Sequence, residues 1–288
     1  GFGKREVWSK ASMTERSSIG LGTVLSDRYE LVAELALGAM GTVYVAIDGV
    51  TTRRVAIKVL HAQHLADDAM RRRFRREGAA LKALDHPAIV RLLDMGIEDT
   101  GLIYFVTEYV EGETLAARLE SGSLRLDEAD RLVEAMCGAI DAAHRHGILH
   151  GDLKPANVLW GSSPRLIDFG ASKVFGLDRL TATGEISGTP AYMAPEVFTG
   201  RGGVDERIDV YGLGALLYHA LSGEPPFVDG HVGRLLMKID AGDCLPLDAI
   251  AEVPLALAEV VTRSMHRHKE QRYRAMTELL DAWQGARS

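Results

Sequence analysis

The hydrophobic period of this chain changes near residue 110, and that change limits the folds it can adopt. Before it, short β-branched runs such as residues 42–48 and 54–60 suggest strands. After it, apolar residues recur at steps of three and four over residues 113–120, 127–147 and 209–223, which is typical of helices. We therefore expect an α+β fold with a small β-rich N-terminal lobe and a larger, mainly α C-terminal lobe.

The first lobe is predicted to hold an antiparallel sheet and one helix. The strand-like runs cover residues 29–35, 42–48, 54–60, 89–97 and 102–110, with turn chemistry at 48–49 and 99–101. The helix is predicted over residues 67–87, where Met70, Phe74, Leu81 and Leu84 share one face. Glu77 interrupts that apolar face. Because a buried carboxylate is costly unless a cation meets it, we expect a basic partner for Glu77.

Composition disfavours several classes of partner. A net charge of -7 over 288 residues argues against nucleic acid or an anionic membrane as the main partner. Cys137 and Cys244 are too few for a disulfide framework or a zinc site, which favours a reducing, cytoplasmic location. The longest apolar stretch, residues 211–223, is shorter than the roughly 20 residues of a spanning helix, so we expect no membrane segment. The chain is equally consistent with the cytosolic domain of a longer protein.

A glycine-rich turn and a lysine suggest a phosphate-binding strand pair. Residues 35–46, LALGAMGTVYVA, place Gly38 and Gly41 between two predicted strands, where the backbone could approach a phosphate chain. That turn alone is weak evidence, because many glycine-rich hairpins bind nothing. The next predicted strand ends the run VAIK in Lys58. Lys58 and Glu77 each need an opposite charge, and together they would hold a cation over the phosphates of a nucleotide.

A second polar cluster lies in HGDLKPANVL, residues 150–159. Asp152 can orient an attacking hydroxyl, Asn157 offers an oxygen ligand for magnesium, and Lys154 can neutralise phosphoryl charge. Further along, an apolar pair leads to Asp168 in the triplet DFG, where a carboxylate could bridge metal and phosphates. A single Asp here would more often be a turn residue. The order and spacing of the whole set predict phosphoryl transfer.

These motifs resemble those of eukaryotic-type protein kinases, most of all the serine/threonine kinases of bacteria, and the resemblance covers about residues 20–285. It implies the bilobal kinase fold, with lobes at 20–110 and 111–285, and ATP and Mg²⁺ as cofactors. It also implies a Lys58–Glu77 pair, Asp152 as catalytic base beside Lys154, and two metal ligands, Asn157 and Asp168. Residues 1–19 are expected to be a flexible leader or an expression remnant, with Met13 a candidate natural start.

The resemblance also assigns a nucleotide pocket. Gly38 and Gly41 would cover the phosphates, and the backbone of Glu108 and Val110 would meet the adenine base. Glu108 and Val110 lie in TEYVEG, residues 107–112, here called the adenine strap. The ring would lie between Val43, Ala56 and Leu159, with Thr107 as a small gatekeeper. Ordinary core packing explains these apolar residues equally well.

Gly151 stands where most protein kinases have arginine, so the loop HGD is of the non-RD type. This departure from the family pattern leaves two alternatives open. The same letters occur in aminoglycoside and choline kinases, which makes a small-molecule kinase one alternative. Residues 188–196, GTPAYMAPE, resemble the peptide-docking segment that those enzymes lack, and Lys154 with Thr189 favours the serine/threonine branch. In the same pattern Glu196 is expected to pair with Arg272, and Asp209 to brace the 150–157 loop.

A pseudokinase or ATP-binding scaffold is the other alternative. Ala36 replaces the first glycine of the loop and Gly151 replaces the arginine, but neither position handles the phosphoryl group or the metal. We therefore expect a catalytically active signalling kinase that phosphorylates protein substrates, with self-association for autophosphorylation as an option. The basic run at 71–76 is expected to be a solvated helix face rather than a phosphate cradle.

Overall fold

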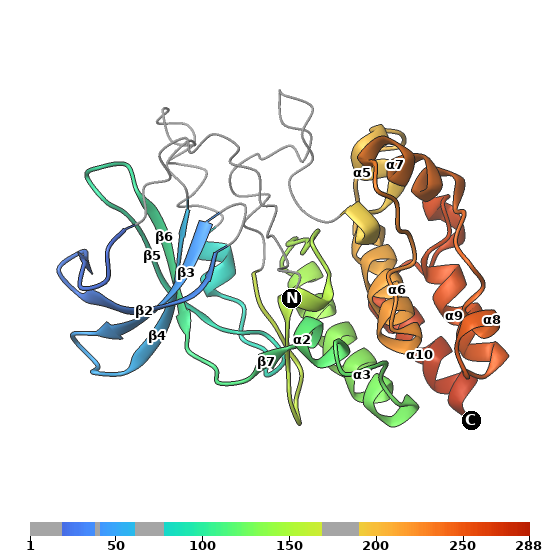
Figure 1. Ribbon diagram of the computed structural model, residues 1–288, viewed down its shortest axis with the longest axis horizontal. Coiled ribbons are helices and arrows are strands. Elements are labelled where there is room, and N and C mark those ends of the chain that lie inside the picture. The colour runs from blue at the N-terminus through green and yellow to red at the C-terminus, as the bar shows by residue number, and fades with distance from the viewer. Residues whose placement is uncertain (1–18, 38–40, 61–77, 169–189) are drawn as a thin grey trace, which may run out of the picture. The chain divides into compact units, whose positions relative to one another are not determined.

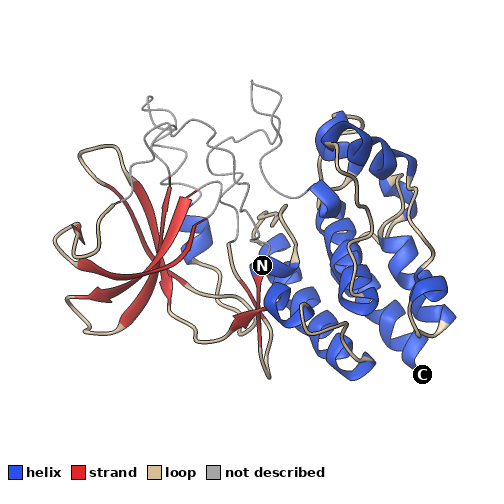
Figure 2. Ribbon diagram, in the orientation of Figure 1, coloured by secondary structure: helices blue, strands red, loops and turns tan. Residues whose placement is uncertain are grey.

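The computed structural model describes residues 19–37, 41–60, 78–168 and 190–288 (Figure 1). The chain divides into two compact units. The first comprises Gly1–Leu65 and Met95–Val106, and the second comprises Ala66–Asp94 and Thr107–Ser288. Strands dominate the described part of the first unit and helices dominate that of the second (Figure 2).

Most of the described first unit belongs to a six-stranded sheet with the strand order β1-β2-β3-β4-β6-β5, of which residues 92–94 and 107–108 fall in the second unit. Its strands are β1 (Val24–Leu25), β2 (Tyr29–Leu37), β3 (Gly41–Asp48), β4 (Arg54–Leu60), β5 (Leu92–Ile97) and β6 (Ile103–Glu108). The five predicted strands are confirmed as β2 to β6. β1 escaped prediction because two residues are too short to show a period.

Register gives the sheet two different faces. Tyr44 and Ile57 are partners on β3 and β4, and both point into an apolar core. That core also contains Leu31 and Val59, each at most 4% exposed. Because side chains alternate along a strand, the neighbouring positions on β3 and β4 face the other way.

The second unit is mainly helical. Its elements are α2 (Leu115–Leu119), α3 (Leu126–His144), α5 (Pro195–Thr199), α6 (Arg207–Ser222), α7 (Val232–Ala241), α8 (Leu247–Ile250), α9 (Leu255–Ser264) and α10 (Met276–Arg287), with 3₁₀ turns η1 (Pro155–Asn157), η2 (Pro190–Tyr192) and η3 (Lys269–Gln271). The helices predicted at 113–120, 127–147 and 209–223 are confirmed as α2, α3 and α6. Of the helix predicted at 67–87, residues 78–82 are helical and 67–77 lie outside the described residues.

A small sheet with the order β7-β8-β9 also belongs to this unit. Its strands are β7 (Glu113–Thr114), β8 (Val158–Trp160) and β9 (Arg165–Leu166), and the sequence did not predict them. β8 follows directly after the 150–157 loop, and β9 leads into Asp168. The pairing of β8 with β9 therefore holds the chain that leaves Asn157 beside the chain that approaches Asp168.

Helix α6 is the centre of the second unit and packs against α3 and α9. Its residues from Asp209 to Tyr218 are all buried, as expected for a helix that is apolar on every side. Gly214 permits close packing, because a Cβ there would lie 2.7 Å from Cβ of Ser264 on α9. α6 is therefore a rigid support for the loops that contact it. Within the described residues, no helix is long and apolar enough to cross a lipid bilayer.

Candidate active site

The 150–157 loop follows α3 after a short connection, residues 145–149. α3 stops at His144, and Gly147 reverses the chain with φ of 68°, a left-handed conformation that glycine adopts without strain. The loop ends in the turn η1, which begins with Pro155, a residue whose fixed φ suits a first helical position. A glycine and a proline thus set the two ends of the segment that carries Asp152 and Lys154.

The structure brings Asp152, Lys154 and Asn157 together. Nζ of Lys154 donates to Oδ2 of Asp152 at 2.8 Å. Nδ2 of Asn157 donates to the same Oδ2 at 3.1 Å and to the backbone oxygen of Asp152 at 2.7 Å. Both side chains of the ion pair are partly exposed, 29% for Asp152 and 22% for Lys154. A carboxylate held by two donors yet open to solvent can accept a proton from an incoming hydroxyl.

His150 connects this cluster to the strand that precedes Asp168. Its Nδ1 accepts the backbone N–H of Asp152 at 3.2 Å, so its Nε2 carries the proton and donates to the backbone oxygen of Ile167 at 3.1 Å. Burial lowers the pKa of His150, which favours this neutral form. The imidazole therefore acts as a fixed spacer between two segments of the site.

Asp209 on α6 braces the loop, as the sequence predicted. Its carboxylate accepts the backbone N–H groups of His150 at 2.9 Å and of Gly151 at 2.6 Å. Nε2 of His144 donates to the same carboxylate at 2.8 Å. Burial raises the pKa of Asp209, but the bonds from His144 and Gly151 outweigh it and hold that pKa below its ordinary value. An ionised carboxylate can accept all three donors at once.

Sequence reasoning missed His144, although a signal was present. Leu132, Met136, Ile140 and His144 follow one another at steps of four on α3, and all are buried. A histidine that ends an apolar stripe must satisfy its ring nitrogens inside the protein. The stripe was therefore an unused signal of a buried polar partner near the end of α3, and that partner is Asp209.

Asp168 and Asn157 supply oxygen atoms of the kind that magnesium prefers. The backbone N–H of Ile167 donates to the backbone oxygen of Asn157 at 2.9 Å, which ties the residue before Asp168 to the end of the loop. Asp168 itself is exposed and has φ of 63°, a conformation rare for residues other than glycine. Because Nδ2 of Asn157 is used on Asp152, its amide oxygen is the atom left to bind a cation. A carboxylate and an amide oxygen suit Mg²⁺.

The first unit holds a second group of predicted residues on one face of its sheet. Val43 on β3 is the register partner of Lys58 on β4, and Ala56 lies two positions before Lys58. These three side chains share the face opposite the apolar core and are only partly buried. A lysine beside two small apolar side chains is an arrangement that can hold the base and phosphates of a nucleotide.

The packing of β3 against β4 requires glycine at position 41. A Cβ at this position would lie 2.1 Å from the backbone oxygen of Val59, so only glycine fits beside β4. The geometry therefore explains Gly41 without a phosphate. Gly38 and Glu77 lie outside the described residues, and so does the predicted pair of Glu77 with Lys58.

The adenine strap and Leu159 belong to the second unit. β6 ends at Glu108, and residues 109–112 lead into β7. Thr107 and Val110 are partly buried, and Leu159 lies on β8 opposite Thr114 and Arg165. The side chain of Glu108 makes an ion pair with Arg165 that the sequence did not predict.

The predicted pair of Glu196 and Arg272 is confirmed. Two guanidinium nitrogens of Arg272 donate to the two carboxylate oxygens of Glu196 at 2.6 and 2.8 Å. Both side chains are buried, and the Arg272 guanidinium also lies 4.9 Å from the centre of the Tyr211 ring on α6. A buried, bidentate pair holds the start of α5 against the loop before α10. Residues 188 and 189 of the peptide-docking motif lie outside the described residues.

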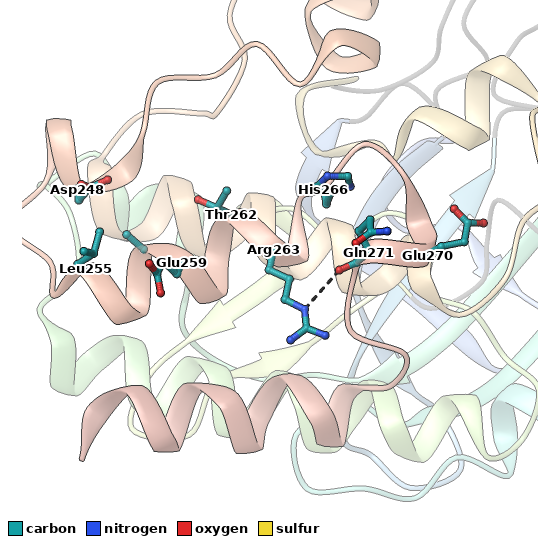
Figure 3. Close-up of a pocket in the computed structure, with 9 residues that line it drawn as sticks. Asp248, Leu255, Glu259, Thr262, Arg263, His266, Glu270 and Gln271 are labelled. Atoms are coloured by element: carbon teal, nitrogen blue, oxygen red, sulfur yellow. Dashed lines mark hydrogen bonds between the residues drawn. The ribbon is translucent and has the colours of Figure 1, made fainter.

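A surface groove of about 460 Å³ lies elsewhere on the second unit, along α8, α9 and η3 (Figure 3). Carboxylates of Asp248, Glu259 and Glu270 line it, and Arg263 donates to the backbone oxygen of Gln271 at 3.4 Å. None of the predicted site residues lines this groove. It is therefore separate from the 150–157 loop.

Comparison with known proteins gives one consistent result. A family model described as a protein kinase domain matches residues 29–283. The serine/threonine-protein kinase PknB of Mycolicibacterium smegmatis is 37% identical over 264 residues, which cover 88% of this chain and 42% of that protein. The serine/threonine-protein kinase pkn2 of Myxococcus xanthus is 37% identical over 277 residues, which cover 92% of this chain and 33% of that protein. The chain thus spans less than half the length of these curated relatives.

Solved structures agree with the sequence relatives. The kinase domain of Mycobacterium tuberculosis PknI superposes with a TM-score of 0.76 at 31% identity, covering 94% of this chain and 99% of that one. The predicted fold, a β-rich N-terminal lobe followed by a mainly α C-terminal lobe, is confirmed. The predicted likeness to bacterial serine/threonine kinases is confirmed as well.

Proposed function

We propose that this chain, which belongs to the protein kinase family, transfers the γ-phosphoryl group of ATP to serine and threonine hydroxyls of protein substrates. The cluster of Asp152, Lys154 and Asn157 is the observation that carries the proposal. It combines a partly exposed carboxylate, a cation and an amide oxygen, the set that phosphoryl transfer to a hydroxyl requires.

Each residue of the cluster has a role in this proposal. Asp152 orients the substrate hydroxyl and accepts its proton as the phosphoryl group is transferred. Lys154 neutralises negative charge on the transferred group. Gly151, which has no side chain, makes the loop a non-RD loop whose position depends on Asp209.

Magnesium and ATP are the proposed cofactors. Asn157 and Asp168 would hold the metal, because their oxygens match its preference. When bound, magnesium neutralises charge on the β- and γ-phosphates. Lys58, paired with Glu77, would hold the α- and β-phosphates, and Gly38 and Gly41 would cover them.

We assign the binding of the adenine base to apolar side chains and to the backbone of the adenine strap. Val43, Ala56 and Leu159 would contact the two faces of the ring. The backbone of Glu108 and Val110 would bind its edge. Thr107 would leave space behind the ring.

Protein substrates are favoured over small molecules for two reasons. The named relatives are serine/threonine-protein kinases, and the Glu196–Arg272 pair supports the segment assigned to peptide docking. An inactive scaffold is disfavoured because every chemical role has a residue in this sequence. We further propose that copies of the chain phosphorylate one another, in the cytoplasm, either alone or as the cytosolic domain of a longer protein.

The test is phosphotransfer from labelled ATP to a generic protein substrate with magnesium present. Asp152→Asn should lower kcat by about 10²- to 10⁴-fold, the usual contribution of a general base. Lys58→Met and Asp168→Asn should abolish transfer. Lys82→Met and Asp127→Asn are matched controls, since both residues are exposed and lie outside the proposed site.

Several results would overturn the proposal. Full activity of Asp152→Asn or Asp168→Asn would show that the site is wrong. Mainly phosphotyrosine in the product would exclude the serine/threonine assignment. Transfer to an aminoglycoside or to choline, but to no protein, would favour the small-molecule alternative.

A further inference from the structure

Arg165 occupies a junction between three segments of the second unit. It lies on β9, three residues before Asp168, and is 23% exposed in its side chain. One of its terminal nitrogens donates to the backbone oxygen of Ile89 at 2.9 Å and also to Oε1 of Glu108. A single guanidinium therefore joins the strand before Asp168 to the first residues of the adenine strap.

Glu108 is held from a second side. Its Oε1 accepts the backbone N–H of Arg91 at 2.8 Å, and its own backbone N–H donates to the oxygen of Arg91 at 3.1 Å. The carboxylate thus has two donors on one oxygen, and the backbone of the same residue is fixed as well. Such charge-assisted bonds restrict both the side chain and the peptide plane of Glu108.

The third segment, residues 88–91, is fastened to β9 along its length. Leu166 N–H donates to the oxygen of Ala88 at 2.8 Å, and Val90 N–H donates to the oxygen of Leu166 at 2.9 Å. These bonds form a short parallel pairing between Ile89 and Leu166. Residues 88–91 therefore form a fixed base, and Arg165 ties Glu108 to it.

We propose that Arg165 is a positioning residue for nucleotide binding, which acts by holding Glu108 and with it the strap backbone that meets the adenine base. The proposal rests on the proposed function, which assigns that backbone to the base. Without Arg165, the Arg91 amide is the one remaining donor to the Glu108 side chain among the residues that the structure describes, and the strap samples more conformations. ATP binding must then restrict those conformations at a cost in affinity.

A restraint on the strap predicts a specific kinetic pattern. Its loss weakens binding of the substrate and of the transition state equally, so KM for ATP rises while kcat is unchanged. KM for the protein substrate should not change, because the proposal assigns the strap to the adenine base and not to the protein substrate. A residue that only stabilises the fold would alter the melting temperature without this split.

The test compares Arg165→Gln with the wild-type chain in two measurements. One is the Kd of a fluorescent adenine nucleotide, which requires no turnover, and the other is phosphotransfer at varied ATP. For Arg165→Gln we expect both Kd and KM for ATP to rise about fivefold or more, the lower end of couplings between protein sites. Arg165→Lys, which keeps the charge but not the guanidinium fork, should recover part of that loss.

Two further variants complete the experiment. Glu108→Gln should weaken nucleotide binding like Arg165→Gln, and the double variant should be no worse than either single one, because both remove one interaction. Arg118→Gln is the matched control, since Arg118 makes an ion pair with Glu128 at a similar exposure of 22%. It should bind nucleotide like the wild type. If Arg165→Gln does not fold, Glu108→Gln carries the test alone.

The outcomes separate the two proposals. Folded Arg165→Gln and Glu108→Gln with wild-type Kd would overturn the role of Arg165. Tighter nucleotide binding or a faster basal rate in these variants would also overturn it, because the Arg165–Glu108 pair would then hold the strap in a conformation that opposes ATP binding. A wild-type chain that binds the nucleotide but transfers no phosphoryl group would overturn the proposed activity and leave the role of Arg165 to the Kd measurements. A wild-type chain that does not bind the nucleotide would overturn both.

Discussion

The backbone N–H of Gly151 donates a hydrogen bond of 2.6 Å to Oδ1 of Asp209, which ties the 150–157 loop to the central helix α6. The preceding amide, from His150, donates to Oδ2 of the same carboxylate at 2.9 Å. Asp209 is 1% exposed, so water cannot replace either donor. A shift of the loop would leave the buried carboxylate with His144 as its remaining donor, which disfavours other positions of the loop.

Replacing Asp209 by asparagine should lower both stability and rate. The side-chain NH₂ of asparagine would face a backbone N–H, and because it is a donor it could not accept that hydrogen bond. We expect a loss of about 3 kcal/mol in the free energy of unfolding, as for other broken buried charge networks. A loop displaced by about 1 Å should cost roughly 100-fold in kcat. Urea unfolding and steady-state kinetics would measure the two effects.

Asp141→Asn is the control for that experiment. Asp141 makes an ion pair with Arg145 on the surface of α3, and such pairs contribute about 0–1 kcal/mol. Asp209→Asn with the stability and kcat of this control would show that the brace does not position the loop.

Gly151 should resist replacement for a reason of backbone geometry. Its φ is 68°, while a Cβ there would lie an acceptable 3.6 Å from Cδ1 of Ile208. The cost of Gly151→Ala is therefore conformational, about 1–2 kcal/mol. Gly151→Asn should lose less, because asparagine tolerates this region better. Thermal or urea unfolding would give both values.

Gly161→Ala provides the comparison for Gly151→Ala. No atom lies within 4 Å of a Cβ at position 161, and its φ is not in the left-handed region. That variant should be neutral or slightly stabilising. Equal stability of Gly151→Ala and the wild type would mean that the loop relaxes around the new side chain.

Stability should fall as pH drops below about 6.5. Burial lowers the pKa of His150 from 6.5, so the folded chain favours the neutral imidazole and the unfolded chain binds the proton more readily. The stabilising contribution is therefore present above pH 6.5 and is lost as pH falls toward the folded-state pKa. His86 and His219 act in the same direction, since burial lowers the pKa of each.

His150→Gln isolates one part of that pH dependence. Glutamine can accept and donate hydrogen bonds but does not titrate. The His150→Gln variant should therefore reduce the slope of the unfolding free energy against pH, between pH 6.5 and 5.5, by up to about 1.4 kcal/mol per pH unit. An unchanged slope would show that His150 is not neutral in the folded chain.

Sequence pattern predicted the strands β2 to β6 and the helices α2, α3 and α6, and missed the two-residue strands. β2 to β6 and α3 carry enough residues to show a period, whereas β1, β7 and β9 have only two residues each. A two-residue strand forms because its neighbours supply donors and acceptors, and nothing in its own letters records that. β9 was therefore visible only as the apolar approach to Asp168.

The candidate site likewise contains residues that the sequence predicted and residues that it did not. Asp152, Lys154 and Asn157 lie within six residues, so their spacing alone predicted a cluster, and the resemblance added Asp209. The ion pair of Glu108 and Arg165 joins residues 57 apart in the sequence. Oppositely charged residues at such sequence separations are common, so the sequence does not single out this pair, and the folded backbone is what brings it together.

The last prediction concerns phosphate on the segment before residue 190. In most protein kinases an arginine at the position of Gly151 contacts such a phosphate, and that contact orders the segment for peptide docking. Glycine offers no side chain for this contact, and here Asp209 holds the loop through its backbone. The position of the loop should therefore not depend on phosphate.

We expect the rate on an added substrate to survive removal of phosphate from Thr181, Thr183 and Ser187, which lie outside the described residues. Changing all three to alanine, or treating the protein with phosphatase, should alter the initial rate by less than about threefold, or ~0.7 kcal/mol of barrier. Ser162→Ala with Ser163→Ala controls for loss of exposed hydroxyls. A fall of about 100-fold, roughly 2.7 kcal/mol of barrier, would show that another cation reads the phosphate and that Gly151 does not free the enzyme from it.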